Sequence, residues 1–416
     1  FNEIYEGNYD PALQADGPVV IKKVTLEDTY FSGVKNGVAG FVASIKGART
    51  ARGVNYPGAI LEMDSCHFKG FLKSDSNVVG GFVANSSGTL SIANSTSDGV
   101  IQGYSNAGGF GGYLYGTISI TNSVNSAKIV GGYSSTGGIV GGVSGTTTIM
   151  NCENNGEVVA RIFNNNAGLV AGILGQSYGK LTFVQNHNAG EISGPSAYMA
   201  GLISDISGSG EVVIANNYNT GAVRSTSPNN TYVAGLISRV YYSDVFGIVA
   251  NNYSIGEISR TKEMYGAIDY VMAVSYSTNL VFENNFVAPT VEGLDTTSLG
   301  IILPMEKFRD GTGADARHNY VQKDGEGVAV ENGITGTAWT QGDEYPVLVT
   351  KSEFALVLNL NGGKLENAPT TYQYGEGLVL PEPTRTGYDF RGWFRSANFQ
   401  GSVVTEISGK DAGDKI

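Results

Sequence analysis

Residues Gly137 to Val159, GGIVGGVSGTTTIMNCENNGEVV, decide the fold of most of this chain. The stretch divides into a Gly-punctuated apolar run, an alternating run that ends at Met150-Asn151, and a Gly followed by two valines. Each piece has the β-branched residues and the period-two alternation of a short strand, and Gly, Ser or Asn marks each break. Because three strands this short cannot hold together alone, the unit needs stacked copies of itself to complete a core.

The unit recurs along roughly the first 290 residues. By subtraction, the spacing of the glycine that opens the apolar run varies from 28 (81 to 109) to 41 (40 to 81). This glycine occurs as Gly40, Gly81, Gly109, Gly138, Gly168, Gly201, Gly235 and Gly266. A second marker, an asparagine after an apolar strand, keeps the same order, as Asn94, Asn122, Asn151, Asn186, Asn216, Asn251 and Asn284. Two unrelated markers with one order and nearly one period indicate an internal repeat.

A period near 30 residues with about three short strands per unit predicts an all-β fold, a parallel β-helix of about nine rungs. Helical repeats of this length would need amphipathic runs with a period of 3.6, and the sequence has none. We predict a right-handed helix, because parallel crossover connections are overwhelmingly right-handed. The alternation within each strand sends Ile, Val, Leu and Met inward and Ser, Thr, Asn and Glu outward.

The segments GGIVGG, AGLVAG, AGLIS and NNYNTGAV resemble the GLUG repeats of bacterial surface proteins and adhesins. The resemblance covers roughly residues 35–290 and implies a location on the cell surface more strongly than it implies one chemistry. We therefore expect residues 1–290 to form a β-helix of GLUG-like repeats with an N-terminal cap. The period breaks down over residues 291–351, where Trp339, Tyr345 and Leu348 are expected to close the last rung as a C-terminal cap.

From residue 352 to residue 416 the chain alternates strand, turn, strand and loop. This segment resembles the Listeria–Bacteroides repeat, the B-repeat of internalin-type surface proteins. The matching residues are Asn361-Gly362-Gly363, Tyr374-Gly375, Leu380-Pro381, Gly387-Tyr388, Phe390 and Gly392-Trp393-Phe394. The resemblance implies a small β-grasp-like module that serves as a spacer or interaction unit. The last strand of that family, a YAxW-like run, would follow Ile416 and is missing, so we expect an incomplete module.

The charge and the apolar runs of the sequence argue against some classes of binding partner. Acidic residues outnumber basic ones 38 to 26, and the net charge of −12 argues against a nucleic-acid partner or insertion into an anionic membrane. The apolar runs are all shorter than the ~18 residues needed to span a bilayer.

Cys66 and Cys152 occupy equivalent slots three rungs apart, which puts them ~14 Å apart, beyond disulfide reach. We expect two free thiols.

Matching slots on successive rungs stack into columns. Tyr218, Tyr253 and Phe286 are expected to form an aromatic ladder between coils, and the alternative is a platform for a sugar ring. The seven marker asparagines are expected to form an amide ladder at a turn. Asp205 and Arg239 are one rung apart and predict an exposed salt bridge, with Tyr270 next in the column.

Two features could hold calcium, although we expect no cofactor. Glu157 and Glu191 share a slot on neighbouring rungs, and solvation is the simpler interpretation. Asp310, Asp315 and Asp324 lie in Gly-rich loops that match no EF-hand spacing, so ordinary turns are the simpler interpretation there as well.

The best glycan-binding candidates are tyrosines expected in loops between strands: Tyr113, Tyr115, Tyr133, Tyr241 and Tyr242. Carboxylates are scattered over different rungs and no HExxH zinc motif occurs, so an enzyme is not expected. The sequence favours an extracellular, monomeric, adhesin-like surface protein that binds a host or environmental glycan or protein. A purely structural stalk is the first alternative, and a β-helix polysaccharide lyase or glycoside hydrolase is the second.

Overall fold

The computed structural model describes residues 3–4, 17–33, 37–51, 54–56, 58–75, 77–161, 168–228, 231–260, 266–269, 271–283, 285–288, 299, 301–302, 339–341, 346–348, 353–373, 378–394 and 403–407. The chain divides into two units, Phe1–Leu348 and Val349–Ile416. The regular elements of the described residues are all β-strands, and none of these residues belongs to a helix that could span a membrane.

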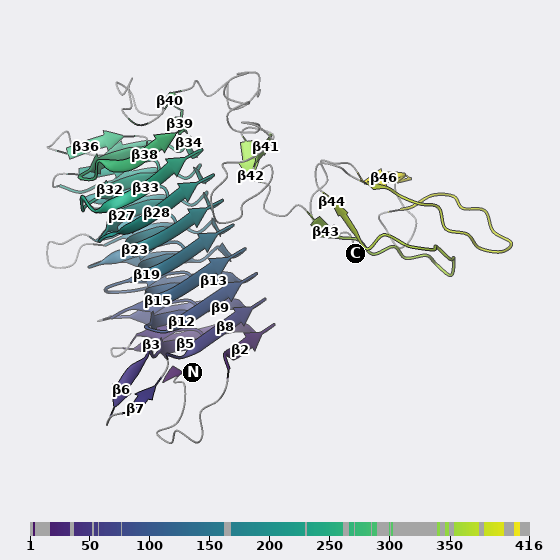
Figure 1. Cartoon of the computed structure of the whole chain (residues 1–416), viewed down its shortest axis with the longest axis horizontal. Coiled ribbons are helices and arrows are strands. Elements are labelled where there is room, and N and C mark those ends of the chain that lie inside the picture. The colour runs from purple at the N-terminus through teal and green to yellow at the C-terminus, as the bar shows by residue number, and fades with distance from the viewer. Residues whose placement is uncertain are drawn as a thin grey trace. The chain divides into compact units, whose positions relative to one another are not determined.

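The first unit is a parallel β-solenoid built from three sheets, whose coils are stacked in Figure 1. The short sheet contains β4 (Val38–Ala39), β10 (Val79–Gly80), β14 (Ala107–Gly108), β18 (Ser135–Gly137), β22 (Leu169–Ala171), β26 (Tyr198–Ala200), β31 (Thr231–Ala234) and β36 (Gly266–Asp269). Every neighbouring pair in this sheet is parallel, as expected when each turn of the chain contributes one strand.

The long sheet follows the short sheet along each turn. Its strands are β1 (Glu3–Ile4), β2 (Val19–Lys22), β5 (Val42–Ile45), β8 (Ile60–Asp64), β11 (Val83–Ser86), β12 (Thr89–Ala93), β15 (Gly111–Thr121), β19 (Val140–Met150), β23 (Leu174–Val184), β27 (Ile203–Ser207), β28 (Gly210–Ala215), β32 (Ile237–Val240), β33 (Val245–Ala250), β37 (Met272–Ser275) and β38 (Asn279–Glu283).

The split sheet completes the turn, mostly with two short strands per coil. Its strands are β3 (Thr25–Gly33), β9 (His67–Ser74), β13 (Thr96–Gln102), β16 (Val124–Asn125), β17 (Lys128–Gly131), β20 (Glu153–Asn154), β21 (Val158–Ala160), β24 (His187–Asn188), β25 (Ile192–Gly194), β29 (Tyr218–Asn219), β30 (Val223–Ser225), β34 (Tyr253–Ser254), β35 (Ile258–Arg260), β39 (Phe286–Val287) and β40 (Ile301–Ile302).

The solenoid makes about six regular turns with a period of about 32 residues. These turns run from Gly80 in β10 to Asp269 in β36. The regular part is therefore shorter than the nine rungs predicted, because the unit before it departs from the period. Ala39 pairs with Gly80, a turn of 41 residues (80 − 39), and this turn contains the antiparallel hairpin of β6 (Arg49–Ala51) and β7 (Val54–Tyr56).

The strand pairing corrects two of the eight opening glycines. The amide of Gly138 donates to the carbonyl of Gly172, so Gly172, and not Gly168, occupies that slot. The sequence AGLVAG has two glycines four residues apart in front of apolar residues, and periodicity alone could not distinguish them. Gly266 begins β36 in the short sheet, which moves the last slot to Tyr270, outside the described residues.

Apolar residues directly after the opening glycines fill the interior. Phe41, Phe82 and Phe110 are buried on three successive coils, with ring centroids 4.9 and 4.7 Å apart. Aromatic contacts at this spacing stabilise by ~0.5–1.5 kcal/mol each beyond the burial of area. On the later coils the same slot holds aliphatic residues, namely Ile139, Ile173, Leu202, Leu236 and Val271.

The marker asparagines lie at the turn between the long and split sheets, where the backbone is left-handed. Asn94, Asn122, Asn151, Asn216 and Asn251 have φ between 51° and 57°, a conformation that asparagine tolerates better than most residues. Side-chain amides connect part of this column, since Asn94 donates to Asp64 (2.8 Å) and Asn151 to Asn122 (3.2 Å). Asn284 lies outside the described residues.

Asn186 does not belong to that column. Gln185 (φ 57°) takes the left-handed slot, and Asn186 is the first member of a buried amide ladder one position further along the chain. Each Nδ2 in this ladder donates to the Oδ1 of the next coil at 2.8 to 3.0 Å, through Asn186, Asn217, Asn252 and Asn285. A second buried ladder lies nearby on the split sheet, through Asn125, Asn154, Asn188, Asn219 and Ser254.

Cys66 and Cys152 are buried free thiols, which confirms the prediction. In the region predicted as a C-terminal cap, the backbone of β41 (Trp339–Gln341) pairs with β42 (Pro346–Leu348), and Trp339 is opposite Leu348. Tyr345 and the three aspartates of the Gly-rich loops, Asp310, Asp315 and Asp324, lie outside the described residues.

The second unit has its own small core of Leu356, Tyr372, Leu380 and Ile407. Two antiparallel pairs frame it: β43 (Glu353–Ala355) with β44 (Thr371–Gln373), and β45 (Leu378–Val379) with β46 (Glu406–Ile407). Trp393 packs against this core and donates its Nε1 hydrogen to the carbonyl of Pro381 (3.0 Å). The β-grasp topology and the missing last strand stay predictions.

Candidate ligand-binding surface

Two adjacent columns of side chains cross the outer side of the long sheet. The first column contains Asn85, Tyr113, Gly142, Gln176, Asp205 and Arg239. The second, two residues further along each strand, contains Tyr115, Ser144, Tyr178, Ser207, Tyr241 and Tyr276. The residues between them, Leu114, Val143, Ile206 and Val240, are buried in the core. Because side chains alternate along a strand, both columns point away from the core.

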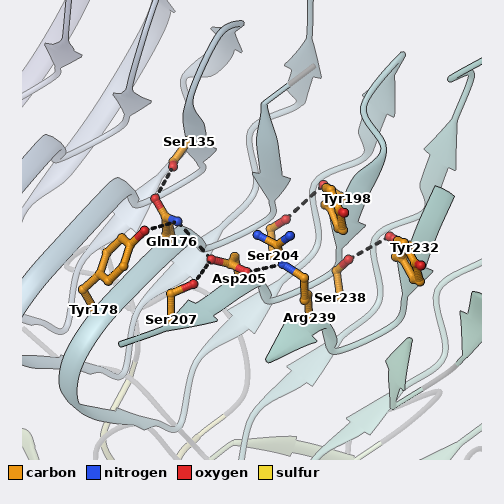
Figure 2. Close-up of polar contacts among 10 residues, drawn as sticks. All are labelled: Ser135, Gln176, Tyr178, Tyr198, Ser204, Asp205, Ser207, Tyr232, Ser238 and Arg239. Atoms are coloured by element: carbon orange, nitrogen blue, oxygen red, sulfur yellow. Dashed lines mark hydrogen bonds and ion pairs between the residues drawn. The ribbon is translucent and has the colours of Figure 1, made fainter. Parts of the chain in front are cut away.

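Asp205 in β27 is at the centre of this surface, and its side chain is completely buried. Arg239 Nε donates to Asp205 Oδ1 at 2.5 Å, and Gln176 Nε2 donates to Oδ2 at 2.9 Å. The Ser207 hydroxyl also donates to Oδ2 (Figure 2). Three donors from three successive coils therefore satisfy this carboxylate, as a buried charge requires.

Arg239 in β32 lies between two tyrosine rings. Its Cζ is 4.2 Å from the ring centroid of Tyr198 and 4.6 Å from that of Tyr241. Tyr198 in turn stacks on Tyr232 in the next coil of the short sheet, at 5.3 Å and an interplanar angle of 7°. Cation–π contacts stabilise by ~0.5–2 kcal/mol each, depending on desolvation. The guanidinium is therefore held by a carboxylate at Nε and by its contacts with the rings of Tyr198 and Tyr241.

Hydroxyl groups fix the backbone of the two stacked tyrosines. Ser204 Oγ donates to the carbonyl of Tyr198 (2.9 Å), and Ser238 Oγ donates to the carbonyl of Tyr232 (2.7 Å). Ser204 and Ser238 each come directly before a member of the first column. The strands that carry the ion pair therefore also bind the backbone of the two tyrosines in the short sheet (Figure 2). We refer to the two columns with Tyr198, Tyr232 and Tyr242 as the tyrosine face.

The electrostatics of the tyrosine face follow from the burial of Asp205. Burial alone would lower the pKa of the Arg239 guanidinium, but the hydrogen bond and the charge of Asp205 raise it. Burial raises the pKa of the Tyr178 hydroxyl, and the charge of Asp205 raises it further. At neutral pH Arg239 is therefore a cation paired with the buried Asp205 carboxylate, and the raised pKa keeps the Tyr178 hydroxyl protonated. The pair is not the exposed salt bridge that we expected, because the Arg239 side chain is only 16% exposed and that of Asp205 is not exposed.

The structure brings four of the five predicted tyrosines to this face. Tyr113 and Tyr115 belong to its columns, and Tyr241 packs edge-on against Tyr242 at 4.9 Å. Tyr276 adds another edge contact to Tyr241 at 5.9 Å. The exposed members form the accessible part of the face: Tyr115 is 53% exposed, Tyr241 46%, Tyr242 46% and Tyr276 57%.

The remaining predicted tyrosine, Tyr133, lies outside the two columns. It follows β17 of the split sheet and stacks on Tyr104 of the preceding coil, with ring centroids 6.0 Å apart. It is 47% exposed, nearly the same as Tyr241. Tyr133 therefore matches the candidate tyrosines in exposure without belonging to the tyrosine face.

The sequence analysis missed Gln176, Tyr178, Tyr198, Tyr232 and Tyr276. A signal for Gln176 was present, because it lies four residues after Gly172 just as Asp205 lies four residues after Gly201. Because the opening glycine was predicted at Gly168 instead of Gly172, counting four residues forward did not reach Gln176. For Tyr198 and Tyr232 no comparable signal existed, since their contact with Arg239 depends on the corner between two sheets.

The predicted aromatic ladder lies on the split sheet. Tyr218 and Tyr253 stack with centroids 5.0 Å apart, and Tyr253 pairs in register with Phe286. All three are buried. His187 extends the column by one coil, with its ring 3.8 Å from that of Tyr218, and its Nδ1 is 3.3 Å from Glu153 Oε1. Burial of these rings favours packing over their use as a sugar platform.

The acidic column of the split sheet is paired with cations. Glu157 contacts Lys128 (2.6 Å) and Glu191 contacts Arg224 (3.7 Å), whose Nη1 is also 2.5 Å from Glu257. Over the residues whose placement is described, no three His, Cys, Asp or Glu side chains come close enough to hold a metal ion. Calcium binding by Glu157 and Glu191 stays an untested alternative.

Comparison with known proteins identifies the second unit. Residues 354–415 match the family model of the Listeria-Bacteroides repeat domain. The searches of curated proteins and of solved structures found no match. The chain therefore joins a β-solenoid to a bacterial surface-type repeat domain.

Proposed function

We propose that this chain belongs to an extracellular, adhesin-like bacterial surface protein whose solenoid binds a glycan through the tyrosine face. The observation that carries the proposal is the group of exposed tyrosines around the buried Asp205–Arg239 pair. The Listeria–Bacteroides repeat supports the cell surface as the location, and the resemblance of the solenoid to GLUG repeats points the same way.

The tyrosine face suits a sugar ligand. A tyrosine ring combines an apolar surface, which can pack against the C–H face of a sugar, with a hydroxyl that can donate or accept a hydrogen bond. Its two rotatable bonds keep the entropic cost of binding low. The two columns belong to the long sheet, and Tyr198 and Tyr232 belong to the short sheet; both sheets are parallel, so the rings are carried by a rigid support and need little reorganisation on binding.

The finer features of the prediction remain part of this proposal. We propose a right-handed helix, a β-grasp-like second unit, a monomeric state and no nucleic-acid partner. A structural stalk is disfavoured by the aromatic side chains, because a spacer has no use for exposed rings gathered on one side. A lyase or glycoside hydrolase would need clustered carboxylates, whereas Asp205, the one acid in the columns, is buried and already hydrogen bonded.

The test is a glycan and matrix-protein array probed with the purified chain, with calcium and again with EDTA. We expect saturable binding to one class of glycan, with a loss of at least tenfold in affinity for the double variant Tyr241→Ala/Tyr276→Ala. Tyr133→Ala is the matched control, since it removes an equally exposed ring that stacks on Tyr104 and lies outside the two columns. Equal binding by all three proteins would refute the role of the face, and the appearance of new reducing ends would favour an enzyme.

A further inference from the structure

We propose that Arg239 recognises the carboxylate of an acidic sugar, so that the ligand is a glycan carrying a sialic or uronic acid unit. The inference rests on the proposed function and adds the chemical class of the ligand. It starts from the way in which the structure holds the guanidinium group.

Arg239 is prepared to act as a rigid fork. Cation–π contacts with Tyr198 and Tyr241 restrict its guanidinium, and the bond to Asp205 fixes the Nε edge. Nε donates to Asp205, and a hydrogen bond with the Tyr198 side chain also acts on the guanidinium. A guanidinium carries five N–H donors, so terminal N–H groups remain beyond these two bonds and can donate to a carboxylate.

Asp205 cannot contact a ligand, because its side chain is not exposed and three donors already satisfy it. It therefore acts as a positioning residue for Arg239. A ligand that reaches this point meets the donors of Arg239, which retains 16% exposure, and must supply the acceptors. A carboxylate supplies two acceptors with a matching charge, whereas a hydroxyl supplies a single weaker one.

The surroundings favour an acidic sugar over an acidic peptide or a dense polyanion. Tyr241 packs on Arg239, and Tyr242 and Tyr276 pack edge-on against Tyr241; the exposed rings of these tyrosines offer flat surfaces for a sugar ring. The net charge of −12 opposes a polymer charged at every unit. One arginine held by one buried acid suits one carboxylate in an otherwise neutral glycan.

The test compares oligosaccharides that differ only in the carboxylate: sialyllactose with lactose, and glucuronate-terminated oligosaccharides with their carboxyl-reduced forms. For the wild-type chain, calorimetry should give an affinity ~10- to 100-fold higher for the carboxylated member, the range expected for hydrogen bonds between charged groups. Arg239→Lys keeps the charge and removes the planar guanidinium, so the affinities for the carboxylated and neutral sugars should come to within ~threefold of each other. Tyr133→Ala should leave it unchanged.

The comparison of ligands with the wild-type chain needs no variant, so the inference stays testable if the Arg239 substitution impairs folding. Equal affinity for both members of each pair would overturn the inference while the glycan-binding function stands. Binding of poly-glutamate as tightly as the acidic sugar would overturn it in favour of an acidic peptide. Binding to no glycan on the array would refute the proposed function itself.

Discussion

The buried amide ladder allows a quantitative test of what holds the coils together. Asn217 Oδ1 accepts from the backbone amide of Asn186 (2.8 Å) and from its Nδ2 (3.0 Å). Its own Nδ2 donates to the carbonyls of Phe183 (2.9 Å) and Ala215 (3.0 Å) and to Oδ1 of Asn252 (2.8 Å). All of these groups are removed from water, so a lost partner is not replaced by solvent.

Asn217→Ala removes all of these bonds and leaves the Asn186 amide without its acceptor. A buried unsatisfied donor costs ~1–3 kcal/mol, and each net hydrogen bond contributes ~0.5–1.5 kcal/mol. Allowing for partners that keep a second bond, we expect the free energy of unfolding to fall by ~3–4 kcal/mol. Urea titration followed by circular dichroism measures this change, and hydrogen exchange at the Asn186 amide shows whether the loss is local.

The chain itself supplies the matched control, because earlier coils have serine in the same slot. Ser95 Oγ accepts from the Cys66 amide (3.1 Å) and donates to the carbonyl of Ala93 (2.7 Å). Asn217→Ser can therefore keep the two corresponding bonds and should recover ~1–2 kcal/mol relative to Asn217→Ala. If the alanine variant loses less than ~1 kcal/mol, or if serine and alanine behave alike, the ladder does not stabilise the stack as argued.

Three further predictions follow from other buried or strained positions. In Gly145→Ala the new Cβ would lie 2.4 Å from the carbonyl oxygen of Gly116 at a φ of +103°, so the urea midpoint should fall by the equivalent of ~1–3 kcal/mol, whereas Ser119→Ala, at a half-buried outward position, should change it little. Burial raises the pKa of Cys152 to about 12, so a thiol reagent at pH 8 should leave this thiol unmodified until urea unfolds the chain, and rapid labelling of the native protein would contradict its burial. The hydrogen bond from His187 lowers the pKa of Glu153 below 4.5, so its contribution to stability is present above that pH and is lost as the pH falls through the folded pKa. The difference in unfolding free energy between wild type and Glu153→Gln should therefore shrink below about pH 4.5, and a pH-independent difference would contradict this sign.

Much of the fold could be predicted because a solenoid repeats its local rules. The opening glycine and the left-handed asparagine recur as one unit per coil, and the alternation between them already separates core from surface. The register of the strands within a coil was harder to predict from the sequence. A slip of four residues between Gly168 and Gly172 keeps the inward and outward pattern intact, because four is a multiple of the strand period, so hydrophobicity alone could not detect it.

The same slip explains why the candidate surface was only partly found. With the slot at Gly172, counting four residues forward from each opening glycine gives Tyr113, Gly142, Gln176, Asp205 and Arg239, a polar and aromatic column instead of an isolated ion pair. The burial of Asp205 could not be predicted from that column. Arg239, the partner of Asp205, packs against the rings of Tyr198 and Tyr241, and Tyr198 comes from a different sheet. Contacts across the corner of a coil depend on how sharply the chain turns, and this angle is set by the packing of the whole stack.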